Sequence, residues 1–410
     1  MLQPVRGTTD LLPSQRRRHA HVVETARQIV ECYGYETLDT PIFEYAPVFQ
    51  SIGETSDIVT KETYTFEDRG GKLLTLRPEG TASVVRAILS NGLTQQLPLK
   101  FFYAGPMFRY ERPQKGRYRQ FHQIGVELLG VDLPLADAEV IAMAQQILDA
   151  LDLEGNITLE INTLGDLESR LAYLKAFTAY LRDFEGQLSQ DSQRRLQKNP
   201  LRVLDSKDLR DIKIVEQAPI YRDHLNAASE DFFAQVLKQL DFLDVKYHIN
   251  NRIVRGLDYY SHTTFEFVSD GLGAQSTVLA GGRYNRLVEV MGGPEIPGIG
   301  WAAGIERLAL LAKGEFQALR PIAVIPIGNV AEAKALELTQ RLRHHGIKVE
   351  LGYAGALKKR LSRANKQRAR CALLLGAEEL EAGKILVRDL DSGEQRQVAD
   401  DKIVEYLQQQ

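Results

Sequence analysis

The chain has 410 residues, of which 44% are hydrophobic and 26% are charged, and its formal net charge is −3. This composition is ordinary for a globular protein with two or three domains and a large core. The two cysteines, Cys32 and Cys371, lie far apart without metal-ligand spacing, which argues against a zinc site and a disulfide framework. We see no signal peptide and no apolar run long enough to span a bilayer, so we expect a reduced, cytoplasmic protein with no membrane contact.

Charge is distributed unevenly along the chain. Residues 320–410 carry 16 Lys and Arg against 12 Asp and Glu, a net of +4, which leaves −7 for the remainder. This asymmetry favours a C-terminal part that meets a polyanion. Residues 358–370 alone hold seven cations and no acid, although a solvated helix face is the commoner explanation of such a run.

The N-terminal part is expected to begin with an amphipathic helix. Ser14 can cap it, apolar residues recur at helical spacing as far as Cys32, and a strand over 35–40 follows. Residues 63–66 and 72–76 then read as a hairpin. A helix begins directly after this hairpin, near Thr81, which taken alone is most simply a helix cap.

A strongly basic hairpin follows, with strands at about 101–107 and 120–129. Its cations repel one another, so the loop either contacts an anionic partner or is a solvated tip, which is the usual explanation of a charge run. The return strand carries His122, Gln123 and Glu127 among apolar residues, and polar groups there are costly without a partner or ligand. This favours a binding site. The loop cations are Arg109, Arg112, Lys115, Arg117 and Arg119.

The middle of the chain changes character twice. A helix at 136–151 and a strand at 157–163 are followed by long polar helices over 164–245, which suggest an insertion packed on the main body. Strand patterning then returns, and Gly298, Gly300 and Gly304 indicate a close backbone approach or a ligand at a strand–helix junction. Their spacing does not match a dinucleotide fingerprint, and the sequence contains no Walker A pattern.

Strands and helices alternate from residue 320 onward, which predicts a mixed α/β sheet in a separate small domain. The expected strands are 322–327, 348–351, 371–375 and 384–389, and the expected helices are 330–345, 357–370 and 402–408.

Taken in order, three of these segments resemble the motifs of class II aminoacyl-tRNA synthetases. Residues 14–41 resemble the first motif, which builds the dimer interface, 102–126 the second, and 298–308 the third. Residues 254–260 and 280–284 are similar to two further motifs of the histidyl-tRNA synthetase family, although Asn285 stands where the family often has Asp. The resemblance covers essentially the whole chain, its motifs are specific in this order, and the class I signatures are absent.

The resemblance implies an α+β fold. It places an antiparallel-sheet catalytic core in 1–163 and 246–315, a mainly helical insertion in 164–245, and an α/β anticodon-binding domain in 320–410. The implied activity is the ATP-dependent attachment of L-histidine to tRNA(His) through a histidyl-adenylate, with release of AMP and pyrophosphate. The implied partners are tRNA(His), L-histidine, ATP with Mg²⁺, and a second copy of the chain.

The resemblance also assigns a histidine site. Acceptors for the α-ammonium are Glu79, Thr81 and Gln123, and the two ring nitrogens meet Glu127 and Tyr260. A carboxylate paired with a tyrosine could reject apolar isosteres by a factor on the order of 10⁴. The full implied set is Glu79, Gly80, Thr81, Arg109, Gln123, Glu127, Arg255, Tyr259 and Tyr260.

On the ATP side, Arg109 and Arg255 are the implied catalytic cations beside the α-phosphate, a place suited to the planar guanidinium fork. Adenine would stack on Phe121. Mg²⁺ would bridge phosphate oxygens without dedicated protein ligands. The implied ATP-binding set is Arg109, Glu111, Arg117, Phe121 and Arg307, and Arg112, Gln114 and Lys115 are weaker candidates for the tRNA acceptor end.

Two alternatives remain open at this point. One is a non-catalytic, synthetase-like regulatory subunit of ATP phosphoribosyltransferase in histidine biosynthesis; such proteins lack the C-terminal domain and tend to lose the 255–260 stretch, and this chain keeps both. The other is a tRNA-binding module with a dead active site. The presence of Glu79, Arg109, Glu127, Arg255 and Arg307 argues against it.

Overall fold

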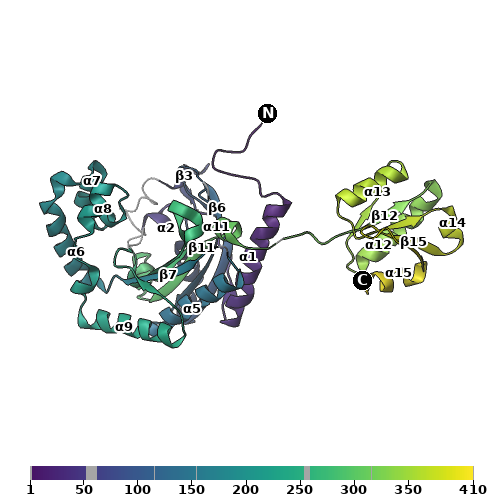
Figure 1. Cartoon of the computed structure of the whole chain (residues 1–410). Helices are drawn as coiled ribbons and strands as arrows, with labels where there is room; N and C mark the ends of the chain where they lie inside the picture. The colour runs from purple at the N-terminus through teal and green to yellow at the C-terminus, as the bar shows by residue number, and fades with distance from the viewer. Residues whose placement is uncertain are drawn as a thin grey trace. The chain divides into compact units, whose positions relative to one another are not determined.

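The computed structural model describes residues 2–51, 62–114, 116–153, 155–253, 259–314 and 316–409 (Figure 1). The chain forms two compact units, residues 1–316 (unit 1) and residues 317–410 (unit 2). Each unit has its own buried apolar core.

Unit 1 is built on a large sheet, in which the described residues form eight strands in the order β1-β5-β6-β11-β10-β9-β7-β8. The central neighbours are antiparallel, and β1 and β8 add parallel pairs at the two edges. The bounds are β1 Glu36–Thr37, β5 Leu99–Phe108, β6 Gln120–Leu129, β7 Ile157–Thr163, β8 His248–Ile249, β9 Ser261–Ser269, β10 Thr277–Arg283 and β11 Gly298–Gly304.

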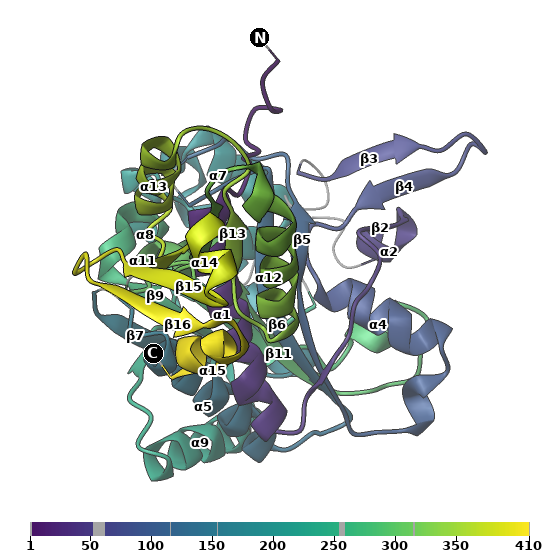
Figure 2. The same ribbon diagram turned by 90° about the vertical axis from the view of Figure 1, so that its right-hand side faces the viewer.

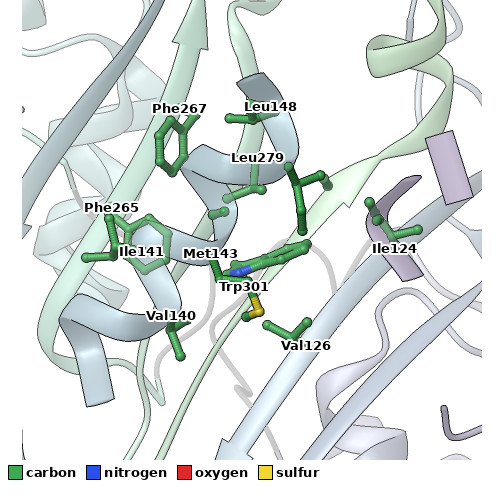
Figure 3. Packing of buried hydrophobic residues seen from close by; sticks show 14 of the residues in the cluster. Ile124, Val126, Val140, Ile141, Met143, Leu148, Phe265, Phe267, Leu279 and Trp301 are labelled. Carbon is green, nitrogen blue, oxygen red and sulfur yellow. The ribbon is translucent and has the colours of Figure 1, made fainter. Parts of the chain in front are cut away.

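Three long helices cover one face of this sheet. They are α1 (Pro13–Cys32), α5 (Pro134–Ala150) and α9 (Ala227–Phe242), and α11 (Ile305–Leu311) packs against α1. Figure 3 shows the ring of Trp301 beside Met143 and Val126 at the centre of this layer. The helix α9 therefore belongs to the main core, where Phe233 and Val236 are buried.

The start of α1 differs from expectation. The helix begins at Pro13 and its N-cap residue is Leu12, so the prediction that Ser14 caps it is wrong. A proline fits the first helical position because it has no N–H to satisfy and its φ is already helical. The side chain of Gln15 instead accepts a hydrogen bond of 3.2 Å from the backbone N–H of Leu12.

The opposite face of the sheet carries shorter elements: α2 (Pro47–Gln50), α4 (Thr81–Ser90), α10 (Leu287–Val290) and a small antiparallel sheet. That sheet has the order β2-β4-β3, with β2 Phe43–Tyr45, β3 Tyr64–Glu67 and β4 Leu73–Leu76. Figure 2 shows it alongside β5. The predicted hairpin is thus confirmed as β3 and β4.

A helical segment between β7 and α9 has a core of its own. It contains α6 (Leu167–Asp183), α7 (Gln190–Lys198) and α8 (Leu209–Val215), which enclose Tyr173, Phe177 and Tyr221. The carboxylate of Asp211 fastens the shorter helices by accepting hydrogen bonds of 2.6 to 2.7 Å from three hydroxyl groups. They belong to Ser189, Ser192 and Ser206.

Unit 2 is a small α/β sheet in the order β13-β12-β14-β15-β16. Its strands are β12 Ile322–Pro326, β13 Val349–Leu351, β14 Cys371–Leu375, β15 Lys384–Asp389 and β16 Gln395–Ala399. Its helices are α12 Glu332–His344, α13 Leu357–Lys366, α14 Ala377–Glu381 and α15 Ile403–Gln408. The expected strands are present, but β16 and α14 were not predicted. The helix α13 ends at Lys366, earlier than expected, and Arg368 beyond it has a left-handed φ of 55°.

The fold as a whole confirms the predicted α+β class. A sheet rich in antiparallel pairs forms the core of unit 1, and the small α/β sheet follows in unit 2.

Candidate active site

A cavity of about 310 Å³ lies on the face of the large sheet that carries α4. Strand alternation supplies its wall: along β6, Phe121 and Gln123 line the cavity, whereas Ile124 and Val126 are buried in the core on the other face. The cavity brings together most of the predicted site residues. Those that line it are Glu79, Thr81, Arg109, Glu111, Arg117, Phe121, Gln123, Tyr259, Tyr260 and Arg307.

Two predicted residues do not line the cavity, and two others lie outside the described residues. Glu127 lies beneath the cavity wall and is 1% exposed. Gly80 does not line the cavity; a Cβ there would lie 2.4 Å from the ring of Tyr103, so the position has room only for glycine. Arg255 lies outside the described residues, as does Lys115.

Glu127 is held by hydroxyl groups on both of its oxygens. Its Oε1 accepts a bond of 2.6 Å from Oγ1 of Thr81, and its Oε2 accepts one from the hydroxyl of Tyr284. Burial raises the pKa of Glu127 to about 8, against the lowering effect of these bonds. A carboxyl group with a strongly raised pKa therefore lies directly behind the pocket, as is common at functional sites.

The glycine at position 300 explains how Glu127 fits. A Cβ there would lie 2.1 Å from Oε2 of Glu127, and a Cβ at Gly298 would lie 2.2 Å from the ring of Tyr284. The sequence suggested a close approach or a ligand at the β11 glycines, and Gly298 and Gly300 make room for side chains of this chain, whereas a Cβ at Gly304 would meet its nearest neighbour only at 3.8 Å.

Glu79 caps α4. Its two oxygens accept hydrogen bonds of 2.8 Å from the backbone N–H groups of Thr81 and Ala82. The prediction that Thr81 is itself the cap is therefore wrong, because its hydroxyl is turned to Glu127. Burial raises the pKa of Glu79. Glu79 thus presents a buried acceptor group to the pocket.

Three guanidinium groups also line the cavity and lie near one another. Arg109 lies over the ring of Phe121, 5.1 Å from its centroid, and its Nε donates to the carbonyl of Pro78. Arg117 pairs with Glu111. Burial, followed by the charges of Arg117 and Arg109, lowers the pKa of Arg307. So many cations around one partly enclosed space favour an anionic ligand.

Gln123 and two tyrosines complete the lining of the cavity. The side-chain oxygen of Gln123 is buried and has no hydrogen-bond partner among the described residues. Tyr259 and Tyr260 lie with ring centroids 4.6 Å apart, and Tyr259 meets Tyr284 edge to face. A polar ligand that donates to Gln123 would remove the cost of its unpaired oxygen.

Sequence reasoning missed Tyr284, which both lines the cavity and holds Glu127. It also missed Tyr103, whose hydroxyl lies 3.5 Å from Oε1 of Glu127. Side-chain alternation gave a signal for Tyr284, because Ala280 and Gly282 precede it at the period-two spacing of one strand face and Ala280 also lines the cavity.

Arg283, in the same motif, has a structural task instead. It is fully buried and pairs with Asp137 on α5, to which its Nε donates at 3.0 Å. Its Nη1 donates to the carbonyl of Val131. This pair fastens the end of β10 to the helical layer, on the face away from the cavity.

One more cluster borders the pocket. Glu306 lines the cavity and bonds His122, and the ring of His19 from α1 meets that of His122 edge to face at 5.7 Å. Ligand atoms of these three residues lie within 4.8 Å of one another. Both oxygens of Glu306 already accept hydrogen bonds from His122.

An antiparallel sheet with this pocket, followed by a small α/β unit, defines a class II aminoacyl-tRNA synthetase. The family model described as "Histidyl-tRNA synthetase" matches residues 7–308, and the one described as "Anticodon binding domain" matches residues 321–410. The chain belongs to the histidyl-tRNA synthetase family.

Similar proteins span the same length. A histidine–tRNA ligase of Rhodospirillum rubrum is 55% identical over 99% of this chain and 98% of its own, and one of Gluconobacter oxydans is 56% identical over 97% and 96%. The crystal structure of apo histidyl-tRNA synthetase from S. aureus is 35% identical, covers 99% of both chains and has a TM-score of 0.84. Within the described residues, no helix has the length and apolar character needed to cross a membrane.

Proposed function

We propose that this chain activates L-histidine with ATP and transfers it to tRNA(His). In the first step the histidine carboxylate attacks the α-phosphorus of ATP, and pyrophosphate leaves as the histidyl-adenylate forms. In the second step the terminal ribose hydroxyl of the tRNA attacks the activated carbonyl, and AMP leaves. The observation that carries this proposal is a single cavity whose lining combines buried acceptors with three guanidinium groups.

The acceptor end suits the amino acid. An α-ammonium group can donate to Gln123, whose side-chain oxygen is buried without a partner, and to Glu79. The imidazole lies against Tyr259, Tyr260 and Tyr284, with Glu127 behind them. Because Glu127 is held by hydroxyl groups on both oxygens, a ring that cannot hydrogen-bond would leave this buried network without its ligand contact.

The cationic end suits the triphosphate. In this proposal Arg109 binds the histidine carboxylate and the α-phosphate, and Arg117 and Arg307 bind the outer phosphates. Fixed positive charges there stabilise a transition state that gathers negative charge. Phe121, already packed under Arg109, offers a face for adenine, and Glu111 would meet the edge of the base. The reaction needs no side-chain nucleophile.

Mg²⁺ enters with ATP. The acidic groups on this side of the cavity are engaged within the chain, Glu111 by Arg117 and Glu306 by His122. The donor set therefore fits an ion bound mainly through phosphate oxygens and water rather than a cage of protein ligands. When bound, the ion would supply charge neutralisation on the phosphates.

We propose that two regions of the chain contact the tRNA. Arg112 and Gln114 are proposed for the acceptor end, as is Lys115, which lies outside the described residues. Backbone hydrogen bonds in both directions join Gln114 and Arg117. The basic face of α13 in unit 2 would contact phosphates of the anticodon stem-loop. Phosphate contacts of this kind position the tRNA, and base contacts select it.

We also propose a homodimer in the cytoplasm, assembled through α1 and β1. Support comes from β1, the exposed edge strand of the large sheet, whose backbone is open on one side to pairing with a second copy. Sedimentation of the purified chain would show a dimer near 92 kDa, about twice the 46.1 kDa chain. A monomer at micromolar concentration would contradict this.

The decisive experiment is histidine-dependent exchange of pyrophosphate into ATP without tRNA. Exchange is expected, and its absence from folded protein would favour the non-catalytic regulatory subunit. Arg255, outside the described residues, is proposed as the second cation at the α-phosphate. Arg255→Ala should nearly abolish exchange while histidine still binds, and exchange at the wild-type rate would remove Arg255 from the mechanism.

A further inference from the structure

The pairing of β6 with its neighbour β11 ends at the edge of the pocket. Gly304 is the last residue of β11 that pairs with β6, opposite Gln123, and the chain then turns into α11. The next residue of β6, His122, therefore presents its backbone N–H to the start of a helix instead of to a strand. On its other side His122 stands opposite Pro106 of β5.

The carboxylate of Glu306 takes the place of the missing strand. Its two oxygens lie 2.9 and 3.0 Å from the backbone nitrogen of His122, and Oε1 lies 2.8 Å from Nδ1 of the same residue. A hydrogen bond to a charged acceptor is stronger than a strand bond between neutral groups. Glu306 is 9% exposed, so little water competes for its oxygens.

The residues on both sides of this anchored N–H line the cavity. Phe121 and Gln123 flank His122 and point to the pocket face, and each has a separate part in the proposed function. Arg307, the next residue after Glu306, bonds the carbonyls of Gly116 and Thr277. Through Glu306 and Arg307, the start of α11 thus hydrogen-bonds to β6, to β10 and to the basic loop.

We propose that Glu306 is a positioning residue for histidine activation. Its carboxylate fixes the backbone of β6 at His122 and thereby holds Gln123 at the histidine end and Phe121 at the adenine end. The ring of His122 also packs edge to face against His19, and this contact joins the Glu306–His122 pair to α1. This inference rests on the proposed function and adds a residue to which no role in it had been given.

The test is a double-mutant cycle in the full-length chain, read by pyrophosphate exchange. Glu306→Gln is nearly isosteric but loses the charge and one acceptor, so kcat/KM should fall about tenfold or more, with higher KM for both histidine and ATP. Glu289→Gln, an exposed carboxylate paired only with Arg286 across one turn of helix, is the matched control and should keep wild-type values.

The cycle combines Glu306→Gln with Gln123→Ala. If Glu306 acts by placing Gln123, the two losses in kcat/KM for histidine are not additive, and the double variant is less impaired than the product of the single effects predicts. Additive losses, or an unchanged KM for both substrates, would overturn the proposal. If Glu306→Gln does not fold, Glu306→Asp replaces it in the same cycle. Failure of the wild-type chain to exchange would instead contradict the proposed function itself.

Discussion

The hydroxyl of Thr81, at the start of α4, donates a hydrogen bond of 2.6 Å to Oε1 of Glu127 in the middle of β6. This bond joins the helix that Glu79 caps to the sheet behind the pocket. We therefore expect protonation of Glu127 to affect both the stability of the fold and the part of the cavity proposed to bind histidine.

The first prediction concerns pH and stability. The pKa of Glu127 is raised from 4.5 to about 8, so the folded chain binds more protons than the unfolded chain between these values. The contribution of Glu127 to the free energy of unfolding must then fall as pH rises through this window, by at most about 1.4 kcal/mol per pH unit. Glu127→Gln lacks this titration. Urea denaturation at pH 5, 6, 7 and 8 measures the free energy of unfolding of both proteins. The value for the variant should rise relative to that of the wild type as pH rises, and a difference that stays constant would contradict the shifted pKa.

The second prediction concerns Tyr284. Tyr284→Phe removes the donor to Oε2 of Glu127 and leaves the ring packing against Tyr259. Loss of one buried hydrogen bond is worth about 1.4 kcal/mol, so KM for histidine should rise about tenfold. KM for ATP should change much less. Equal rises in both constants would mean that Tyr284 does not act at the histidine end.

The third prediction concerns Arg109. Arg109→Lys keeps the charge but loses the planar group that lies over Phe121 and donates to Pro78. Exchange should slow on the order of 100-fold, because a fixed donor at the reacting phosphate is lost. Arg86→Lys, which alters an arginine that pairs with Glu44 away from the cavity lining, is the control. Similar rates in the two variants would argue against a catalytic place for Arg109.

The fourth prediction separates structure from catalysis within residues 280–284. Asp137→Asn leaves the fully buried Arg283 without its charge partner, which should lower the free energy of unfolding by about 3 to 5 kcal/mol. Asp132→Asn changes the exposed second partner of Arg283 and should have little effect. Thermal denaturation measures both. A comparable loss in the two variants would mean that burial of the Asp137 pair is not what stabilises this corner.

The fifth prediction concerns unit 2. A chain that ends at Phe316, the last residue of unit 1, keeps the core of that unit and every residue that lines the cavity. It should still exchange pyrophosphate at a measurable rate but charge tRNA poorly, because the cations of α13 are gone. Aminoacylation with labelled histidine measures this. Undiminished charging would remove unit 2 from tRNA recognition.

Much of the site is visible in the sequence because its residues occur at strand periodicity. The polar residues Gln123 and Glu127 stand on one face of β6, and their cost in an apolar strand points to a ligand or partner. The structure adds that Glu127 has its partners within the chain. Those partners, Thr81 and Tyr284, come from distant segments, and a single sequence does not show which distant hydroxyl groups meet one carboxylate.

The helix starts were harder to predict for a related reason. Ser14 and Thr81 both have the residue type of a cap, yet Pro13 and Glu79 determine how those helices begin. Local preference is decided there by the tertiary contact that each side chain makes: the hydroxyl of Thr81 stabilises the fold more as a donor to a buried carboxylate than as a cap on its own helix.

The glycine at position 300 limits how this pocket can evolve. Because Oε2 of Glu127 occupies the space where a side chain on β11 would begin, neither residue can be exchanged for a larger one alone. A descendant of this protein with a side chain at position 300 would have to change β6 and β11 together, so this corner behind the pocket is protected against that single substitution. A library that randomises positions 127 and 300 as a pair would find solutions that scanning either position alone would miss.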